Sequence, residues 1–416
     1  MPEFLELLPP LQALNKLLGE LAGRLIGEVV SIHTATGRVL CAPVMAPYAL
    51  PSFPRSTVDG YAVRAEDTYG ASESLPAYLS LIGEVPMGGE PDFRISTASC
   101  ALIHTGGMLP NGANAVVMVE YTQTARPGEV ELLRAVAEGE NVLHEGEDVR
   151  LGEQVIPTGS LLRPAEIGGL AALGITEVTV CRKPRVGIIS TGDEVVPLDQ
   201  ALTPGQVHDV NTYTLSALVQ NEGGIPKSYG ILPDRQKILN ETTQRALRDC
   251  DVVVITAGSS ASTRDLTSEV VHSLGPPGVL VHGVNVRPGK PTILGVCTTQ
   301  GQRKAVIGLP GNPVSALVIA GLFVVPVIHH LLGVLPRARP AVQAQLAINL
   351  SSQAGREDWV PVRLHNDPTH PFPSAEPVFG KSNLIFTLAR ADGLICIPAD
   401  ANGLPAGELV NVFLSY

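Results

Sequence analysis

Three short apolar runs, each followed at once by a polar loop that contains glycine, most constrain the fold of this chain. They lie at residues 185–190, 251–256 and 304–308. Runs this short and this rich in Val and Ile are typical of strands buried on both faces. Helical segments lie between them, which predicts a parallel sheet with right-handed connections. Because ligands bind at the carboxyl ends of such strands, the loops that follow the runs predict one active cleft.

The length and composition place this sheet in a larger protein of multidomain α/β plus β class. The chain has 416 residues, 44% hydrophobic and 17% charged, with 42 Gly and 35 Pro. These values are typical of a soluble globular chain of about three domains by length alone, with many turns and hence β-rich parts. The expected domains are a discontinuous helical linker domain (1–46 and 147–182), a small β domain (47–146), the α/β domain (183–334) and a C-terminal β-barrel domain (335–416).

Two stretches are expected to form the helices of the linker domain. Leucines recur at helical spacing over residues 5–21, and residues 163–174 begin with a proline suited to a first turn and end with a glycine suited to a C-cap. We expect these helices to pack together. A longer apolar stretch, 314–328, is interrupted by Pro326 and falls short of the ~20 residues of a membrane span. It predicts a buried core helix and no contact with a membrane.

The net charge and the cysteines limit the functional class. A net charge of −11 argues against binding of nucleic acid, which requires a basic face. Basic residues near the cleft would then serve a small anionic ligand. The six cysteines are scattered without a CxxC pair, which favours free thiols over a metal site or a disulfide framework. The first residues have no signal-peptide pattern, so we expect a cytoplasmic protein.

Two loops carry groups that suit an oxyanion. Pro310, Gly311 and Asn312 join a strand to a helix, whose N-terminus carries partial positive charge. Arg287 and Lys290 flank a rigid Pro-Gly turn, and both cations suit phosphate. The alternatives are an ordinary tight turn and a solvated basic turn. In a chain of acidic net charge, we favour the ligand interpretation for the basic turn.

Several carboxylates stand near turns and near these loops: Asp59, Glu194, Asp209 (with Asn211) and Asp265. Carboxylates beside a phosphate site imply Mg²⁺, which prefers oxygen ligands and bridges phosphates. Each carboxylate alone is more often a cap or a turn residue, so the prediction depends on their convergence. The sequence has neither the nucleophile elbow of serine hydrolases nor a P-loop.

An ordered set of short motifs extends over nearly the whole chain. The motifs are Asp59-Gly60-Tyr61-Ala62, Thr105-Gly106-Gly107, Gly146-Glu147-Asp148-Val149, Ser190-Thr191-Gly192-Asp193-Glu194, Asp209-Val210-Asn211, Pro288-Gly289-Lys290-Pro291, Leu309-Pro310-Gly311-Asn312-Pro313 and Lys381-Ser382-Asn383. In this order they resemble the molybdopterin molybdenumtransferase family, of the MoeA and gephyrin E-domain type. No single motif is decisive, whereas the ordered set is highly specific.

The resemblance implies an elongated homodimer whose α/β domain is of the molybdopterin-binding type. It also implies Mg²⁺-dependent hydrolysis of adenylylated molybdopterin, insertion of molybdate into the dithiolene and release of AMP. The expected partners are therefore adenylylated molybdopterin, molybdate and a second copy of the chain. An adenylyltransferase that supplies the pterin is a further candidate partner.

The resemblance also implies roles for single residues. The expected catalytic carboxylates are Asp59, Asp148, Glu194, Asp209 and Asp265. Those expected to hold Mg²⁺ and the nucleotide are Glu194, Asp209 and Asp265. Arg287 and Lys290 would bind molybdate or phosphate. The residues expected to approach from the partner subunit are Asp59, Asp148 and Ser382. The other substrate-binding candidates are Thr105, Thr191, Gly192, Asn211, Ser259, Ser260, Pro310, Gly311 and Asn312.

The chain departs from the family pattern in two places. Where the family usually has Gly-Gly-Val-Ser before its acidic residue, residues 257–265 are richer in hydroxyls and include Arg264. Arg287 stands where Lys is common. Two alternatives stay open: a paralogue that inserts tungstate, and a non-catalytic sensor or scaffold that binds molybdopterin. A single-domain adenylyltransferase is disfavoured because its Thr-Gly-Gly-Thr-Gly loop is absent.

Overall fold

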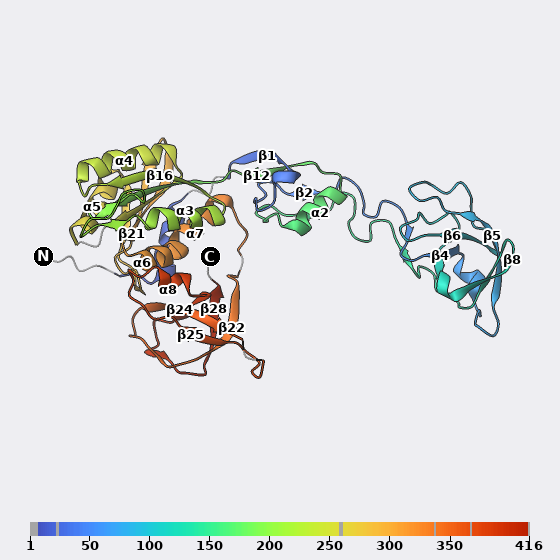
Figure 1. Ribbon diagram of the computed structural model, residues 1–416. Coiled ribbons are helices and arrows are strands. Elements are labelled where there is room, and N and C mark those ends of the chain that lie inside the picture. Colours follow the sequence, from blue (N-terminus) through green and yellow to red (C-terminus); the bar gives the residue numbers. More distant parts are fainter. Residues whose placement is uncertain (1–6, 22–24, 258–260, 337, 367, 415–416) are drawn as a thin grey trace. The chain divides into compact units, whose positions relative to one another are not determined.

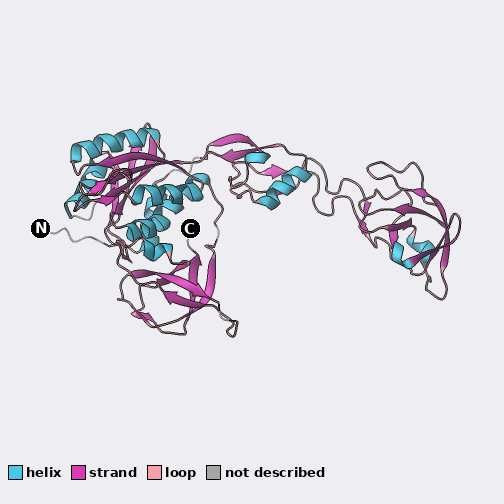
Figure 2. Cartoon of the chain, in the orientation of Figure 1, coloured by secondary structure: helices cyan, strands magenta, loops and turns pink. Residues whose placement is uncertain are grey.

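The computed structural model describes residues 7–21, 25–257, 261–336, 338–366 and 368–414. The chain forms two compact units, which Figures 1 and 2 show as ribbons. Unit 1 comprises Met1–Ala42, Thr158–Arg163 and Val178–Tyr416. Unit 2 comprises Pro43–Pro157 and Pro164–Glu177, so its sequence is inserted within that of unit 1.

A six-stranded mixed sheet is the centre of unit 1. Its strands, in spatial order, are β16 (Ile225–Leu232), β13 (Arg185–Thr191), β17 (Val252–Ala257), β21 (Gln302–Pro310), β20 (Ile293–Thr299) and β18 (Pro277–His282). The expected runs form β13, β17 and β21, which are parallel neighbours. The predicted all-parallel sheet is wrong at one edge, where β20 is antiparallel to both β21 and β18. The reason is a two-residue turn, Gln300 and Gly301, with φ of 52° and 73°, which fits a tight hairpin.

Helices cover both faces of this sheet. Residues of β17 alternate between two cores: Val252 and Val254 face one, Val253 and Ile255 the other. The first core is covered by α1 (Pro10–Glu20), α3 (Asn211–Asn221), α6 (Pro313–Ile319), the π-helical turn η4 (Ala320–Val324) and α7 (Val325–Leu332). The second is covered by α4 (Gln236–Asp249) and α5 (Ala261–Ser273). Figure 1 shows α4 and α5 on the side of the sheet opposite α3, α6 and α7.

The apolar helical run from α6 to α7 is long and apolar enough to cross a membrane by composition alone. Most of it is buried inside unit 1, and Phe323, Val324 and Val327 are fully buried. The run therefore packs as a core helix, in agreement with the interruption at Pro326.

The two expected linker helices belong to different units. Ala13, Leu17 and Leu21, in and just after α1, are part of the core beneath the sheet of unit 1. The other helix, α2 (Pro164–Ala172), belongs to unit 2. The expected packing of these helices against each other stays a prediction. The boundaries of the four expected domains stay a prediction.

The C-terminal part of unit 1 is a closed β structure. Five strands pair in a ring: β24 (Glu357–His365), β25 (Ser374–Pro377), β22 (Ala341–Leu346), β28 (Leu409–Leu414) and β26 (Gly393–Ile397), which returns to β24. A two-residue strand from the α/β part, β19 (Val286–Arg287), pairs in parallel with β24. Arg287 is thereby placed opposite Asp358.

Unit 2 is built around a second six-stranded sheet. Its strands, in spatial order, are β7 (Ala115–Met118), β4 (Gly60–Val63), β6 (Ser99–Ile103), β5 (Ala77–Glu84), β9 (Glu129–Leu132) and β8 (Thr122–Arg126). Short pairs join β3 (Arg55–Ser56) to β10 (Val142–Leu143), and β2 (Val44–Met45) to β11 (Gln154–Ile156). A small β domain was expected in this part of the sequence.

Candidate active site

A hollow of about 540 Å³ lies at the carboxyl ends of β13, β17 and β21. We call it the acidic cavity. Its lining includes six residues expected from the sequence, Thr191, Glu194, Asp209, Asn211, Gly311 and Asn312, together with Thr256 at the end of β17. Parallel strands place their carboxyl ends side by side, which is why loops far apart in sequence meet here.

The first loop of the acidic cavity depends on a glycine. Gly192 has a φ of 144°, and a Cβ at this position would lie 2.9 Å from Glu194 Oε2 and 2.9 Å from Val195 Cγ2. A side chain at this φ would be strained, and the flexible Glu194 carboxylate would have to move aside. Gly192 itself does not line the cavity.

Asp234, which the sequence did not single out as a site residue, lies beside this loop. Burial raises the pKa of its carboxyl group, and the nearby Asp193 and Glu194 carboxylates raise the pKa further, against a hydrogen bond with Thr191 that lowers it. Asp234 Oδ1 is buried without a hydrogen-bond partner among the described residues. A cation bound among these carboxylates would stabilise the charged form of Asp234. It would also give the buried Oδ1 atom a partner.

The second loop of the acidic cavity leads into α3. Asp209 is 5% exposed, and its Oδ1 accepts a hydrogen bond from the backbone N–H of Thr212, 3.0 Å away. Asn211 Nδ2 donates to the Gly311 carbonyl at 2.8 Å, which ties α3 to the loop after β21. Asn211 Oδ1 is buried and finds no partner in the described part of the chain. The cavity therefore has one lining amide oxygen atom, Asn211 Oδ1, without a hydrogen-bond partner in the described chain.

A second and larger hollow, of about 1080 Å³, lies where the α/β part meets the barrel. We call it the basic cavity. Its lining includes the expected Arg287, Lys290, Pro310, Asn312 and Ser382. Other polar residues line it that were not expected as site residues, among them Ser315, Arg356, Lys381 and Asn383. Four cations thus converge on one hollow, with Asp358 the only carboxylate among the described lining residues.

The basic turn is fixed by a close packing contact. Gly289 has a φ of 113°, and a Cβ there would lie 2.2 Å from Ile319 Cγ1 in α6. The turn therefore packs directly on this helix, which holds Arg287 and Lys290 on either side of it at the rim of the cavity.

Asp358 links two arginines of the basic cavity. It is 4% exposed, and its Oδ1 accepts a hydrogen bond from Arg356 Nε at 2.8 Å. Arg287 Nη1 lies 3.5 Å from Asp358 Oδ2. The Arg287 side chain is 64% exposed, so this pair orients the guanidinium more than it stabilises the fold.

Ser382 is supplied by the same chain, which corrects the expectation that it comes from a partner subunit. Asn312 Nδ2 donates to Ser382 Oγ at 3.0 Å, and Val314 N donates to the Ser382 carbonyl at 3.0 Å. The barrel therefore caps the N-terminus of α6. This backbone N–H, which we expected to face an oxyanion, already has a protein partner.

The acidic and basic cavities share two lining residues, Asn312 and Asn383. They are therefore adjoining parts of one site with a carboxylate-rich end and a cation-rich end. A ligand that spans both would present a metal-bound phosphate to one end and free oxyanions to the other.

The other expected site residues lie in unit 2 or outside the described part. Asp59 Oδ1 accepts hydrogen bonds from Thr105 N at 2.8 Å and Thr105 Oγ1 at 3.1 Å, and the first of these most strongly lowers the pKa of Asp59. His104 lies between two carboxylates, with Nδ1 3.7 Å from Asp59 Oδ1 and Nε2 3.2 Å from Glu84 Oε1. The backbone N–H of Asp148 donates to Leu50 O, 3.0 Å away.

Three expected residues cannot be placed fully. Ser259 and Ser260 lie outside the described residues. The backbone of Asp265 belongs to α5, but its side chain lies outside the described part of the structure.

The missed residues differ in the signal that they carried. Lys381 and Asn383 flank Ser382 in a matched motif, so that motif could have indicated them. Asp234 precedes a helix by two residues and resembled a cap. Arg356 had no sequence signal, because its role depends on the pairing of β19 with β24.

Comparisons with known proteins cover almost the whole chain. Residues 8–174 match the MoeA N-terminal region (domain I and II), residues 187–330 a probable molybdopterin-binding domain, and residues 343–414 the MoeA C-terminal region (domain IV). A molybdopterin molybdenumtransferase of Nostoc sp. is 36% identical over 92% of this chain and 88% of its own length. A putative molybdopterin biosynthesis protein of Methanocaldococcus jannaschii is 36% identical over 98% of both chains.

The fold has relatives among solved structures. A molybdopterin biosynthesis moeA protein from Pyrococcus horikoshii OT3 is similar with a TM-score of 0.86 and 33% identity, over 99% of this chain and 100% of that one. The ordered motifs, the mixed-sheet fold and these relatives agree. The chain belongs to the MoeA family of molybdopterin molybdenumtransferases, enzymes of molybdenum cofactor biosynthesis.

Proposed function

We propose that this chain inserts molybdate into adenylylated molybdopterin in a Mg²⁺-dependent reaction that releases AMP. The observation that carries the proposal is the pair of adjoining cavities, one lined by the Glu194 and Asp209 carboxylates and one by four cations, which share Asn312 and Asn383. Adenylylated molybdopterin contains a phosphoanhydride, and molybdate is a separate incoming oxyanion. The two substrates together need both environments at once.

The oxygen atoms of the acidic cavity fit Mg²⁺. Glu194, Asp209 and Asn211 line the cavity, and the buried Asn211 Oδ1 has no partner among the described residues. Asp234, beside the first loop but outside the lining, has a second such atom, Oδ1. A hard cation prefers oxygen donors of this kind. We propose that Glu194, Asp209 and Asp265 hold the ion, which when bound offsets negative charge on the phosphoanhydride. Among the described residues, no ready-made cluster of three metal-ligating side chains is present, so phosphate and water would complete the coordination.

The basic cavity suits the oxyanion. Lys290 and Arg287 at the rim, with Arg356 behind Asp358, provide positive charge where molybdate or a pterin phosphate would bind. Tungstate has the same charge and tetrahedral shape as molybdate. We therefore expect this cavity to accept both anions, and a tungstate-inserting role is the second candidate.

We further propose that a second copy of the chain supplies Asp59 and Asp148 to this cleft. The Asp59 carboxylate is fixed by Thr105 but is 62% exposed, so it is oriented and accessible. An adenylyltransferase would deliver the substrate. All six cysteines are free thiols, which supports a reducing compartment such as the cytoplasm.

The direct test incubates the purified protein with adenylylated molybdopterin, Mg²⁺ and molybdate, and follows AMP. We expect AMP release that stops when Mg²⁺ is chelated and that proceeds with tungstate as well. Tight pterin binding without AMP release would overturn the enzyme proposal and favour a sensor or scaffold.

A mixing experiment tests the role of the second copy. Asp59→Asn and Glu194→Gln variants, each inactive alone, should regain up to about a quarter of the wild-type rate when their subunits are exchanged, because a statistical half of the dimers then contains one intact cleft of two. No recovery in verified mixed dimers would place Asp59 in its own chain's cleft or outside any cleft.

A further inference from the structure

The basic cavity has one exposed aromatic side chain in its wall. Phe379 lines the cavity and is 70% exposed. Trp359 also lines it, but this residue is only partly exposed, and its ring packs on Phe413 with 5.6 Å between the ring centroids. Among the lining residues that the structure describes, Phe379 is the only large apolar one that is exposed. Its ring therefore stands open in a hollow that four cations also line.

The chain on both sides of Phe379 is held in place. Val378 N donates to the Pro361 carbonyl at 2.8 Å. Gly380 packs against a buried side chain, because a Cβ at this position would lie 2.2 Å from Thr387 Oγ1. The backbone thus fixes the base of the Phe379 side chain, while no contact of its ring with another aromatic or a cationic side chain is found in the described part of the chain. A ring presented in this way is preorganised to contact a ligand.

An exposed phenyl ring suits one kind of ligand surface. Its flat faces bind other flat rings by stacking, and the contact removes apolar area from water. Such stacking tolerates the hydrogen-bonding groups at the edge of a heterocycle, since every aromatic heterocycle has a π-face. Phe379 is therefore suited to a flat heterocycle, and not to molybdate, which has no apolar surface.

The substrate of the proposed function has two flat heterocycles, adenine and the pterin. The phosphoanhydride belongs in the acidic cavity with Mg²⁺, whereas the pterin side carries the dithiolene that receives molybdate from the cations of the basic cavity. The pterin must therefore lie in the basic cavity. We infer, on the basis of the proposed function, that Phe379 stacks on the pterin ring and is a residue that selects the pterin half of the substrate.

The chain supplies both a matched control and a reporter for a test. Phe386 is 68% exposed, stands at the start of α8 (Phe386–Ala389), and lines neither the acidic nor the basic cavity. Its ring is about as open to water as that of Phe379 but lies outside the proposed pterin site. Trp359 is the single tryptophan of the chain and lines the basic cavity, so its fluorescence should report a ligand bound there.

The test measures the Kd of adenylylated molybdopterin on the full-length protein by Trp359 fluorescence, with molybdate omitted so that the ligand stays intact. Phe379→Leu keeps an apolar side chain but removes the ring, so the Kd should rise about tenfold, as is typical for the loss of one stacked ring. Phe379→Tyr keeps a ring and should bind as tightly as the wild type, as should the control Phe386→Leu. The Kd of AMP, measured by calorimetry, and the KM for molybdate should stay unchanged in Phe379→Leu.

If the pterin Kd is unchanged in Phe379→Leu while the wild type binds the substrate and releases AMP, the inference is overturned and the proposed function stands. Weaker AMP binding in Phe379→Leu would place adenine at the ring and overturn the inference as well. Equal losses of affinity in Phe379→Leu and Phe386→Leu would also overturn it, because the effect would not depend on the cavity. Pterin binding that depends on the Phe379 ring, without AMP release by the wild type, would support the inference and contradict the proposed enzyme alone.

Discussion

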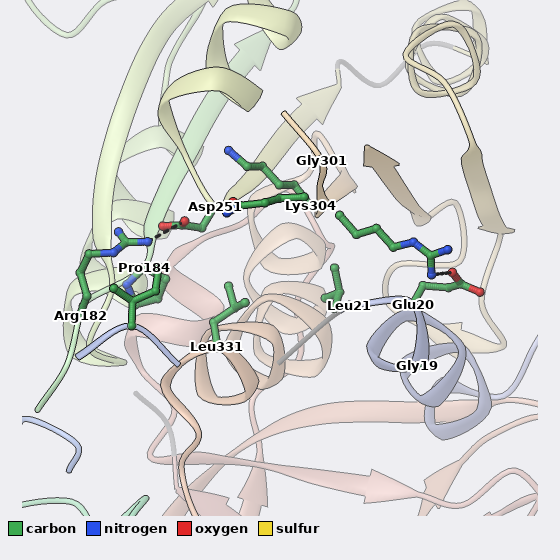
Figure 3. Close-up of a pocket in the computed structure, with 12 residues that line it drawn as sticks. Gly19, Glu20, Leu21, Arg182, Pro184, Asp251, Gly301, Lys304 and Leu331 are labelled. Atoms are coloured by element: carbon green, nitrogen blue, oxygen red, sulfur yellow. Dashed lines mark hydrogen bonds and ion pairs between the residues drawn. The ribbon is translucent and has the colours of Figure 1, made fainter. Parts of the chain in front are cut away.

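The two edges of the main sheet in unit 1 differ in whether their buried polar groups have partners within the protein. At the carboxyl edge, Asn211 Oδ1 and Asp234 Oδ1 are buried without a protein partner in the described chain. At the amino edge, where β13, β17 and β21 begin, Asp251 and Arg182 neutralise each other (Figure 3), and Asp251 accepts a further backbone hydrogen bond. Unmatched buried atoms cost stability, so a fold retains them where a ligand matches them. The contrast separates an edge built for ligands from an edge built largely for stability.

The largest effect should come from a charge removed at the carboxyl edge. Glu194→Gln keeps the shape of the side chain but removes the negative charge that would hold Mg²⁺. We expect AMP release to fall by about 10²–10³-fold, as for the loss of one electrostatic contact in a transition state. Steady-state AMP assays measure the change. The control is Asp199→Asn, which changes an exposed carboxylate in the neighbouring loop and should keep the wild-type rate. An equal loss of rate in both variants would contradict the proposed role of Glu194 in holding Mg²⁺.

A smaller effect should come from the basic cavity. Lys290→Ala removes one rim cation, so the KM for molybdate should rise about tenfold, while kcat at saturating molybdate changes little. The measurement is AMP release as a function of molybdate concentration. Lys237→Ala, an exposed lysine in α4, is the matched control. An unchanged KM in Lys290→Ala would remove this lysine from the oxyanion site.

At the amino edge, the same kind of substitution should affect stability instead of catalysis. Asp251→Asn weakens the contacts to Arg182 and to the Arg185 backbone, which are only partly exposed. We expect the free energy of unfolding to fall by about 1–3 kcal/mol, with kcat and KM unchanged. Denaturant unfolding measures the change in the free energy of unfolding, and the AMP assay measures kcat and KM. A loss of activity without a loss of stability in this variant would contradict the interpretation that the amino edge serves stability and the carboxyl edge serves ligand binding.

The smallest effect concerns the buried ammonium group of Lys304 at the amino edge. Because burial lowers the folded-state pKa of Lys304, the unfolded chain holds the extra proton just below the ordinary lysine value of 10.5. Stability should therefore rise as pH increases through that window. In Lys304→Met this rise should disappear, and the difference between the two proteins should narrow at high pH. Urea unfolding at a series of pH values measures this difference, and parallel pH curves would contradict the lowered pKa of Lys304.

The sequence predicted the centre of the site better than its surroundings. Buried runs that end in glycine loops correctly predicted β13, β17 and β21 as parallel neighbours. Thr191, Glu194, Asp209 and Asn211 meet in one cavity because strand ends in a parallel sheet must meet. Periodicity and loop chemistry are local properties, and a local pattern is sufficient for this inference.

What the sequence did not predict depends on long-range pairing. Arg356 and Asp358 enter the basic cavity because β19, a strand of only two residues, joins the barrel beside β24. The antiparallel edge of the sheet depends on the positive φ of Gln300, which the sequence alone does not reveal. Ser382 belongs to the same chain's cavity because it contacts Asn312, seventy positions away. No residue pattern near these positions encodes such contacts.

The strand β19 also limits how this protein can be recombined. Val286 and Arg287 belong by sequence to the α/β part but complete the hydrogen bonding of the barrel at Glu357 and Asp358. The barrel is therefore not an independent cassette. A chimaera that received residues 341–414 from a distant relative would inherit a sheet edge shaped for another partner strand. Exchange in evolution or in the laboratory must move the 284–291 turn together with the barrel.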